Sequence, residues 1–312
     1  MNKQNISARI PNKIRAHKKD IYRTITEQIV KSIEAGAGTF QMPWHRDLGN
    51  TMPTNALTGA TYNGVNVIAL WAAAELSGFA AGYWATYKQW AGLGAQVRKG
   101  EKGSVVVFYK QRDLDESDAE VGETETKSAR FARSSHVFNV AQVDGWQAPK
   151  PSTQGTAQIL REVEKFVAAT AAEIRIGGDR AYYRPASDHI QIPDRDRFTG
   201  TDTISATESF YATLLHELSH WTGHQKRLDR DLSRRFGTQG YAMEELVAEL
   251  GAAFLCCELG ITSQARPDHA AYIAHWLAVM KQDPRAIFAA ASKAKAAKSY
   301  LMALQKAARV SD

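Results

Sequence analysis

Cysteine is scarce in this sequence, and long apolar runs are missing from it. Its two cysteines, Cys256 and Cys257, are neighbours in a chain of 312 residues. A disulfide between adjacent residues would be strained, which argues against a secreted fold held by disulfides. No run reaches the roughly eighteen apolar residues of a membrane-spanning helix, and the polar, basic N-terminus lacks the apolar segment of a secretory signal. We therefore expect a cytoplasmic protein with no membrane partner.

Acidic residues are also scarce, but only at one end of the chain. Residues 1–112 contain 15 Lys and Arg against 6 Asp and Glu, residues 113–150 contain 4 against 8, and residues 151–312 contain 20 against 19. The regional net charges are therefore +9, −4 and +1, in agreement with the formal net charge of +6. A basic excess confined to one region indicates that this region meets a polyanion, and nucleic acid is the first partner to expect.

The length predicts two domains, and the ordinary composition predicts that they are folded. The helices and strands expected along the chain give the α+β class. Residues 146–155 are rich in Pro, Ser and Gly, as is typical of a linker, so we place the domains at residues 1–150 and 151–312. Residues 113–127 carry seven acids and are interpreted as a solvated insertion in the first domain. The second domain is predicted to be mainly helical with a small sheet.

Apolar periodicity and glycine stops predict the elements of the first domain. Helices are expected at 21–36, 65–77 and 86–91, whereas residues 96–110 are interpreted as strand, cationic turn and strand. In the second domain, short strands are expected before the long helices. Residues 181–193 would form an edge to which an extended peptide could add as one more strand.

A metal-binding pattern lies inside one predicted helix of the second domain. The helix begins at the capping box Ser205-Ala-Thr-Glu208 and contains His216-Glu217-Leu-Ser-His220. Residues at i and i+4 lie one above the other on a helix, so the two imidazoles can bind one ion. Glu217 lies beside them and can handle the proton of an activated water. The pattern predicts a Zn²⁺ site, with another divalent metal as the alternative, and Glu217 as its catalytic residue.

A catalytic zinc needs a third protein ligand. His224 lies eight residues after His216, about 12 Å along a straight helix, so it would reach the ion only if the chain folds back at Gly223. On the next predicted helix, Glu245 and Glu249 share one face with the small residues Ala248 and Ala252, which let that helix approach the first one and direct carboxylates at the metal. We favour Glu245 as the ligand. Glu249 is then assigned to orient a ligand imidazole through its distal N–H. The alternative ligands are Glu249, His224 and Glu244.

Aromatic and basic residues alternate in the first domain. Rings that stack on bases, beside cations that follow phosphates, bind single strands without sequence preference. The alternative for each ring is a place in the hydrophobic core. The residues predicted to bind DNA are Trp44, Arg46, Trp84, Tyr87, Lys88, Arg98, Lys99 and Lys102.

Two sets of motifs resemble the ArdC family of antirestriction proteins, over nearly the whole chain. The first set includes Thr58-Gly-Ala-Thr-Tyr62 and Gly94-Ala-Gln-Val-Arg-Lys-Gly-Glu-Lys-Gly103, and the second includes His216 to Gly223 and Glu244-Glu-Leu-Val-Ala-Glu249. The resemblance implies an N-terminal domain that binds single-stranded DNA, followed by a zincin-like metallopeptidase domain. It also implies a role in plasmid conjugation, in which incoming single-stranded DNA is shielded from restriction.

The metallopeptidase part of that family is similar to zincins whose third ligand is a glutamate in an ExxA context. Glu245-Leu-Val-Ala248 matches this context, whereas Glu249 stands where the wider class often has Asp or Asn. Two functions remain open. The first is an antirestriction protein that binds single-stranded DNA without sequence specificity. The alternative is a DNA-recruited zinc endopeptidase that cleaves DNA-bound proteins. Restriction enzymes or other DNA-bound proteins are the candidate protein partners.

Overall fold

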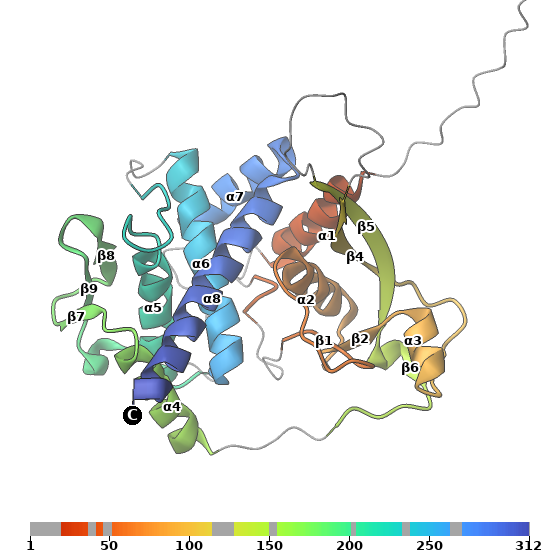
Figure 1. The fold of residues 1–312 in the computed structure, drawn as a ribbon, viewed down its shortest axis with the longest axis horizontal. Coiled ribbons are helices and arrows are strands. Elements are labelled where there is room, and N and C mark those ends of the chain that lie inside the picture. Colours follow the sequence, from red (N-terminus) through yellow and green to blue (C-terminus); the bar gives the residue numbers. More distant parts are fainter. Residues whose placement is uncertain are drawn as a thin grey trace, which may run out of the picture.

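The computed structural model describes residues 20–36, 42–45, 52–113, 128–149, 155–200, 204–232, 238–262 and 270–311. Arg46, the rest of the predicted acidic insertion after Asp113 and the centre of the predicted linker lie outside these ranges. The small sheet, helices α5, α6 and α8, helices α2 and α1, and the larger sheet follow one another across the molecule (Figure 1). The fold is thus α+β with two domains, as the sequence predicts.

The first domain is built around two helices. Helix α1 (Ile21–Gly36) buries Ile25, Ile29 and Ile33, which recur every four residues. Helix α2 (Val65–Ser77) is apolar nearly all round and lies in the interior. Gly78 ends α2 in the left-handed conformation at φ 67°, which glycine adopts without strain. Both helices match their predicted ranges. The short helix α3 (Tyr87–Gly92) begins at a capping box formed by Thr86 and Gln89.

A four-stranded sheet covers α2, in the order β1 (Thr54–Asn55), β2 (Tyr83–Ala85), β5 (Ser128–Asn139) and β4 (Ser104–Asp113). Asn66 joins helix to sheet, because its side-chain amide donates to the Val107 carbonyl at 2.7 Å and accepts from the Val107 N–H at 2.8 Å. These two hydrogen bonds are of the kind that a neighbouring strand would make to Val107, and they satisfy the polar atoms of the buried amide.

Residues 96–110 form the predicted strand, turn and strand, but the two strands do not pair with each other. Strand β3 (Gln96–Val97) pairs with β6 (Val143–Asp144), which follows the 3₁₀ turn η3 (Val140–Gln142), whereas β4 pairs with β5. Val97 and Val143 are buried together with Trp90 in a small separate cluster. Burial of these apolar side chains decides the pairing, and it overrides the short loop between β3 and β4.

The second domain is mainly helical. After α4 (Thr156–Ala168) comes a sheet in the order β7 (Glu173–Ile176), β9 (His189–Ile192) and β8 (Tyr182–Arg184), which leaves β8 at one edge. Two 3₁₀ turns, η4 (Pro185–Ser187) and η5 (Arg195–Arg197), flank β9. The remaining elements are the helices α5 (Ala206–Trp221), α6 (Gln239–Leu259), α7 (Ala270–Gln282) and α8 (Ala286–Ser311). Within the described residues, no helix is long and apolar enough to span a membrane.

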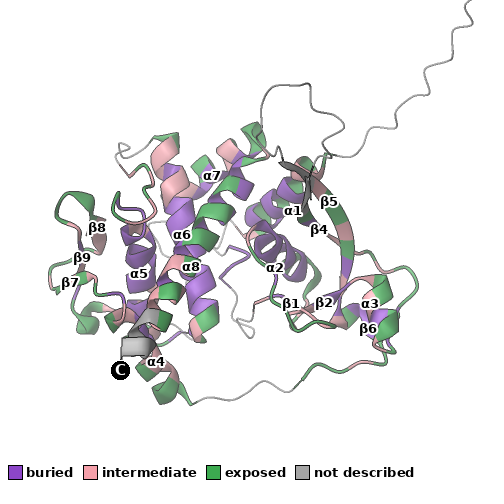
Figure 2. Cartoon of the chain, in the orientation of Figure 1, coloured by how far each residue is buried: buried purple, intermediate pink, exposed green. Residues whose placement is uncertain are grey.

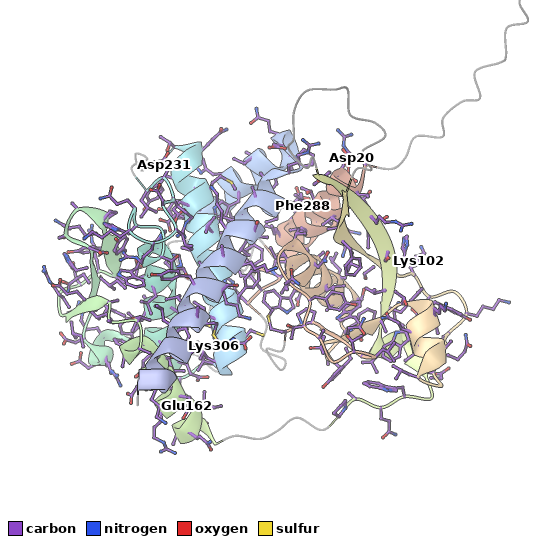
Figure 3. The ribbon with its side chains drawn as sticks, viewed as in Figure 1. Asp20, Lys102, Glu162, Asp231, Phe288 and Lys306 are labelled. Atoms are coloured by element: carbon purple, nitrogen blue, oxygen red, sulfur yellow. The ribbon has the colours of Figure 1, made fainter. Side chains whose placement is uncertain are left out.

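The largest hydrophobic cluster contains residues of both domains. Helices α1 and α2 contribute to it together with α6, α7 and α8, and Figure 2 shows the buried segments of α2, α6 and α8. Trp71 of α2 packs on Phe254 of α6 with ring centroids 5.9 Å apart. Phe288, labelled in Figure 3, packs on Tyr22 at 4.7 Å. The domains therefore share a core instead of meeting across a polar interface.

Helices α5 and α6 pack unusually closely. A Cβ atom built on Gly251 would lie 2.6 Å from Ser219 Oγ and 3.0 Å from Ser219 Cβ. Ser219 is fully buried, and its hydroxyl donates to the Leu215 carbonyl at 2.9 Å. Ala248 is also fully buried on α6. Small side chains on α6 therefore let its backbone approach α5, as the sequence predicts from Ala248 and its neighbours.

The shared core predicts that both domains unfold in one cooperative transition. Phe254→Ala should lower the free energy of unfolding by about 3–5 kcal/mol, because it opens a cavity where the domains meet. Leu76→Ala, at a side chain that is 40% exposed, is the control and should change stability by less than about 0.5 kcal/mol. Urea denaturation followed by circular dichroism and tryptophan fluorescence measures both. Two separate transitions in the wild-type protein would contradict the shared core.

The close contact of α5 and α6 predicts that Gly251→Ala destabilises the protein by about 1–3 kcal/mol through overpacking. Ser219→Ala added to that variant should restore part of the loss, because it removes the nearest atom. Gly92→Ala is the matched control, since a Cβ there meets nothing within 4 Å. The measurement is urea denaturation of all four proteins. Equal stability of Gly251→Ala and wild type would show that the helices have room to move apart.

Candidate metal centre

Helix α5 presents the first part of the site. Its start is fixed by the predicted capping box, in which Ser205 Oγ accepts from the Glu208 N–H at 3.2 Å and Glu208 Oε2 accepts from the Ser205 N–H at 3.0 Å. Two turns further on, His216 and Glu217 are buried and His220 is half-buried. The buried neighbours Leu214, Leu215 and Leu218 anchor the helix in the core of the second domain. The imidazoles are therefore held on a rigid element.

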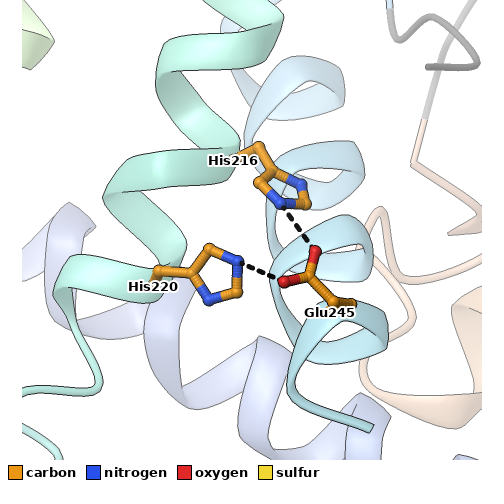
Figure 4. A group of neighbouring side chains, drawn as sticks. All are labelled: His216, His220 and Glu245. Atoms are coloured by element: carbon orange, nitrogen blue, oxygen red, sulfur yellow. Dashed lines mark ion pairs between the residues drawn. The ribbon is translucent and has the colours of Figure 1, made fainter. Parts of the chain in front are cut away.

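Helix α6 supplies the third group. Glu245 Oε2 lies 3.5 Å from His216 Nε2, and Glu245 Oε1 lies 3.5 Å from His220 Nε2 (Figure 4). One ligand atom from each of the three residues lies within 4.8 Å of the others. For an ion bound at about 2.1 Å in tetrahedral geometry, two ligand atoms are about 3.4 Å apart. The donor set and its spacing therefore fit a divalent metal.

Two more glutamates of α6, Glu249 and Glu244, face the remaining nitrogens of the imidazoles. Glu249 Oε2 lies 3.6 Å from His216 Nδ1, and Glu244 Oε1 lies 3.3 Å from His220 Nδ1. Arg230 holds Glu244 with a contact of 2.8 Å from Nη2 to Oε1. Each histidine thus has Nε2 toward the cluster and Nδ1 toward a carboxylate, as in metal sites where a carboxylate fixes the ligand ring.

The carboxylates give the site a negative potential. Burial by itself lowers the pKa of His220, but the charges and hydrogen bonds of Glu245 and Glu244 outweigh it and raise the pKa to about 10. Burial acts to raise the pKa of Glu245, but His220 and His216 hold it well below its ordinary value. The field that favours a proton on His220 equally favours a metal cation among these groups.

A cleft of about 190 Å³ opens onto the cluster. Glu217 lines it beside the two histidines, and Tyr182 and Tyr183 of the edge strand β8 form another wall. Tyr241 and Tyr272 line it as well, although no sequence motif singles them out. Burial, reinforced by the charge of Glu245, raises the pKa of Tyr241 above its ordinary value, so its hydroxyl stays protonated and can donate.

His224 lies in the turn after α5 and outside the cluster. Its Nδ1 accepts from the Lys226 N–H at 3.2 Å, and the ring is buried. Among the described residues, the metal-ligand group contains His216, His220 and Glu245 and excludes His224. The chain does turn at Gly223, but the turn leaves this ring outside the group.

Two of the rings predicted to stack on DNA are in the core. Trp44 is 0% exposed and Trp84 is 1% exposed, so neither offers a face to a base, and that prediction is wrong for both. Trp84 packs against Phe79, whose ring centroid is 5.9 Å away, and Trp44 packs against Trp276 at 6.4 Å. The sequence pattern of tryptophans among basic residues predicts a surface for base stacking. These two rings are buried instead, because burial of their large apolar area stabilises the fold.

The other predicted DNA-binding residues lie at the surface or outside the described ranges. Arg98 is exposed, but its guanidinium is engaged by its own domain, since it contacts Asp144, Glu101 and the Ala141 carbonyl. Arg46 cannot be placed because it lies outside the described residues. The exposed remainder consists of Tyr87, Lys88, Lys99 and Lys102.

A groove of about 890 Å³ lies in the first domain and reaches one of these residues. Lys88 lines it together with Phe108, whose side chain is 46% exposed on β4, and Leu57, which is 48% exposed. The lining also includes amide and hydroxyl side chains, among them Asn55 and Gln89, which are hydrogen-bonded to each other at 3.3 Å. Neither Phe108 nor the amides are among the residues that the sequence predicts to bind DNA. Phe108 follows three valines in a predicted strand, and this pattern does not distinguish an exposed ring from a buried one.

Comparison with protein families divides the chain in the same way as the fold. Residues 19–138 match the N-terminal domain of anti-restriction factor ArdC, and residues 161–293 match a zincin-like metallopeptidase. An uncharacterized protein, y4eC, of Sinorhizobium fredii is 48% identical over 93% of this chain and 94% of its own length. DNA primase TraC of Escherichia coli is 38% identical over 93% of this chain, which corresponds to 28% of the primase.

Solved structures show the same relationship. The metal-free crystal structure of antirestriction ArdC protein from the R388 plasmid is 38% identical, with a TM-score of 0.73 over 92% of this chain and 98% of that one. The Mn(II)-bound structure of that protein aligns with a TM-score of 0.72 at 36% identity. The chain therefore belongs to the ArdC family of antirestriction proteins, with an ArdC N-terminal domain joined to a zincin-like metallopeptidase domain.

Proposed function

We propose that this chain protects DNA from restriction by binding it as a single strand, and that its second domain is a metal-dependent peptidase. The observation that carries the peptidase is the convergence of His216, His220 and Glu245 within 4.8 Å on a cleft that also contains Glu217. The groove beside Phe108 and Lys88 supports the DNA-binding function. Zn²⁺ is the proposed metal, and the Mn(II)-bound relative supports a divalent ion at this site.

His216 Nε2, His220 Nε2 and one carboxylate oxygen of Glu245 would hold the ion. When bound, it would supply Lewis acidity, which polarises a scissile carbonyl and makes a water molecule a better nucleophile near neutral pH. Glu249 and Glu244 would orient the two imidazoles from behind. Glu217 and Asp231 are the other carboxylates that line the cleft, and Glu217 is the one that lies on the same helix as both ligand histidines.

Glu217 would move the protons of the reaction. Its carboxylate accepts a proton from the attacking water and then passes it to the leaving amine of the cleaved peptide. Strand β8 is the sheet edge beside the cleft, so a peptide that adds to it would pass the metal site in an extended conformation. The Tyr241 hydroxyl lies in the same cleft and would donate to the oxygen on which negative charge develops.

Glu217→Gln is expected to abolish peptide cleavage and to leave metal binding nearly unchanged, because it removes the proton acceptor and keeps all three ligands. The loss of rate should be at least about 100-fold, as for other general bases. Calorimetry with Zn²⁺ and Mn²⁺ measures binding, and a gel measures cleavage of a restriction endonuclease mixed with the protein and DNA. Glu162→Gln on α4 (Figure 3), where the side chain is 45% exposed, is the control. Cleavage that persists in Glu217→Gln would remove Glu217 from this role.

A comparison of the wild-type protein with Glu217→Gln also distinguishes peptidase action from DNA coating. Single-stranded and duplex DNA are exposed to the endonuclease in the presence of each protein, and both the DNA and the nuclease are followed. Loss of protection in Glu217→Gln, with nuclease fragments in the wild-type reaction, would make this a DNA-recruited endopeptidase that cleaves DNA-bound proteins. Equal protection by both, with intact nuclease, would make the DNA-binding domain the source of protection.

Single-stranded DNA would bind along the groove of the first domain. Phe108 offers an exposed ring on which a base can stack, and Lys88 offers a cation for phosphate. Thr61 and Asn63 also line the groove and offer polar side chains to base edges that are free only in a single strand. Lys99 and Lys102 are exposed on the loop before β4 and extend the basic surface.

Phe108→Ala should weaken binding of a single-stranded oligonucleotide by about 1–3 kcal/mol through lost stacking. Lys88→Ala should reduce the slope of log affinity against log salt by about 0.7, the value for one phosphate contact on a single strand. Fluorescence anisotropy across a salt series measures both effects. The controls are Leu76→Ala, another exposed apolar side chain, and Lys165→Ala on α4. Tighter binding to duplex than to single strands would contradict the proposed groove.

A further inference from the structure

A segment of the first domain reaches the metal centre of the second. Residues Met42 to His45 form a turn closed by a hydrogen bond of 2.8 Å from the His45 N–H to the Met42 carbonyl. Trp44 and His45 of this turn are 0% and 6% exposed. The Trp44 ring lies 6.1 Å from that of His45 and 6.4 Å from that of Trp276 on α7. The turn is thus fixed in the shared core.

Both side chains contact the same oxygen of Glu249. Trp44 Nε1 donates to Glu249 Oε1 at 3.2 Å, and His45 Nε2 lies 2.5 Å from that oxygen. The Met42 N–H donates to His45 Nδ1 at 3.2 Å, so Nδ1 is the acceptor nitrogen and Nε2 carries the hydrogen. Two donors from one turn therefore converge on one carboxylate oxygen, 204 and 205 residues away in the chain.

The other carboxylate oxygen of Glu249, Oε2, faces the candidate metal centre. Glu249 Oε2 lies 3.6 Å from His216 Nδ1, the nitrogen opposite the one that faces Glu245. Glu249 is only 4% exposed, and a buried carboxylate is costly unless donors satisfy it. The turn supplies these donors, so it also fixes the rotamer in which Oε2 faces His216.

We propose that Trp44 and His45 are positioning residues of the metal centre, which hold Glu249 so that it orients the His216 imidazole. The inference rests on the metal site of the proposed function. It gives these two residues of the DNA-binding domain a role in the peptidase domain. Metal affinity then depends on both domains, although all three ligands belong to one of them. Trp44, predicted to stack on DNA, acts instead through its indole N–H.

Metal affinity of the full-length protein tests this role. Trp44→Phe removes one donor and keeps an aromatic ring, and His45→Ala removes the other. Each variant should raise the Kd for Mn²⁺, measured by calorimetry, by about 10–100-fold, the usual cost of losing a partner of a ligand histidine. The visible spectrum of the Co²⁺-loaded protein should also change, because it reports ligand geometry. His45→Gln should recover much of the affinity, since its amide can donate to Glu249.

Trp276→Phe is the matched control. It removes an indole donor from the same core, but that donor is bonded to the Ala242 carbonyl at 2.7 Å and not to Glu249. A similar fall in the melting temperature of Trp276→Phe and Trp44→Phe, with a raised Kd only in the latter, supports the positioning role. Unchanged Kd values in both Trp44→Phe and His45→Ala, or an equal rise in Trp276→Phe, would overturn it. A wild-type protein that binds neither Mn²⁺ nor Zn²⁺ would instead refute the proposed metal site itself and this inference with it.

Discussion

The close packing of α5 on α6 is the constraint on which the candidate site depends. Two ligand groups lie on one helix and the third on the other, and an ion can join them only if ligand atoms approach to about 3.4 Å. The contact of Gly251 with Ser219 brings the backbones together one and a half turns away from Glu245. Glu245 then reaches both imidazoles at 3.5 Å without leaving its helix. The geometry of the site is thus a consequence of helix packing.

The buried carboxylates of α6 connect the packing of α5 on α6 with the rest of the molecule, because their partners come from other segments. Each of the three glutamates on the site face of α6 has partners that compensate its charge, because an uncompensated buried charge would cost several kcal/mol. Glu245 faces the two histidines, Glu244 is held by Arg230, and Glu249 is held by the turn at Trp44 and His45. The last of these partners comes from the other domain. The shared hydrophobic core around α2 and α6 keeps it in place, so the first domain and the candidate metal centre are parts of one packed structure.

Features set by neighbouring residues were predictable from the sequence. The capping box at Ser205, the glycine that ends α2 and the two histidines on one face of α5 all depend on contacts within a few residues, and the structure has each of them. The preference for Glu245 followed from helical spacing and from the family resemblance, and it agrees with the cluster found here. The fold class and the family were likewise predictable, because the periodic spacing of apolar residues and the family motifs are both present in the sequence itself.

The sequence by itself determined the helices, the histidine pair and the basic character of the first domain, because each follows from local spacing or composition. Tertiary structure alone decided which strands pair with β3 and β4, which tryptophans are buried, and which groups hold Glu249. The sequence does not show whether a tryptophan in a basic segment is exposed to DNA or buried in the core. Only the packing of the folded chain distinguishes these two positions. The bond from His45 to Glu249 joins residues 204 positions apart, and such a contact exists only once the shared core has brought the two domains together.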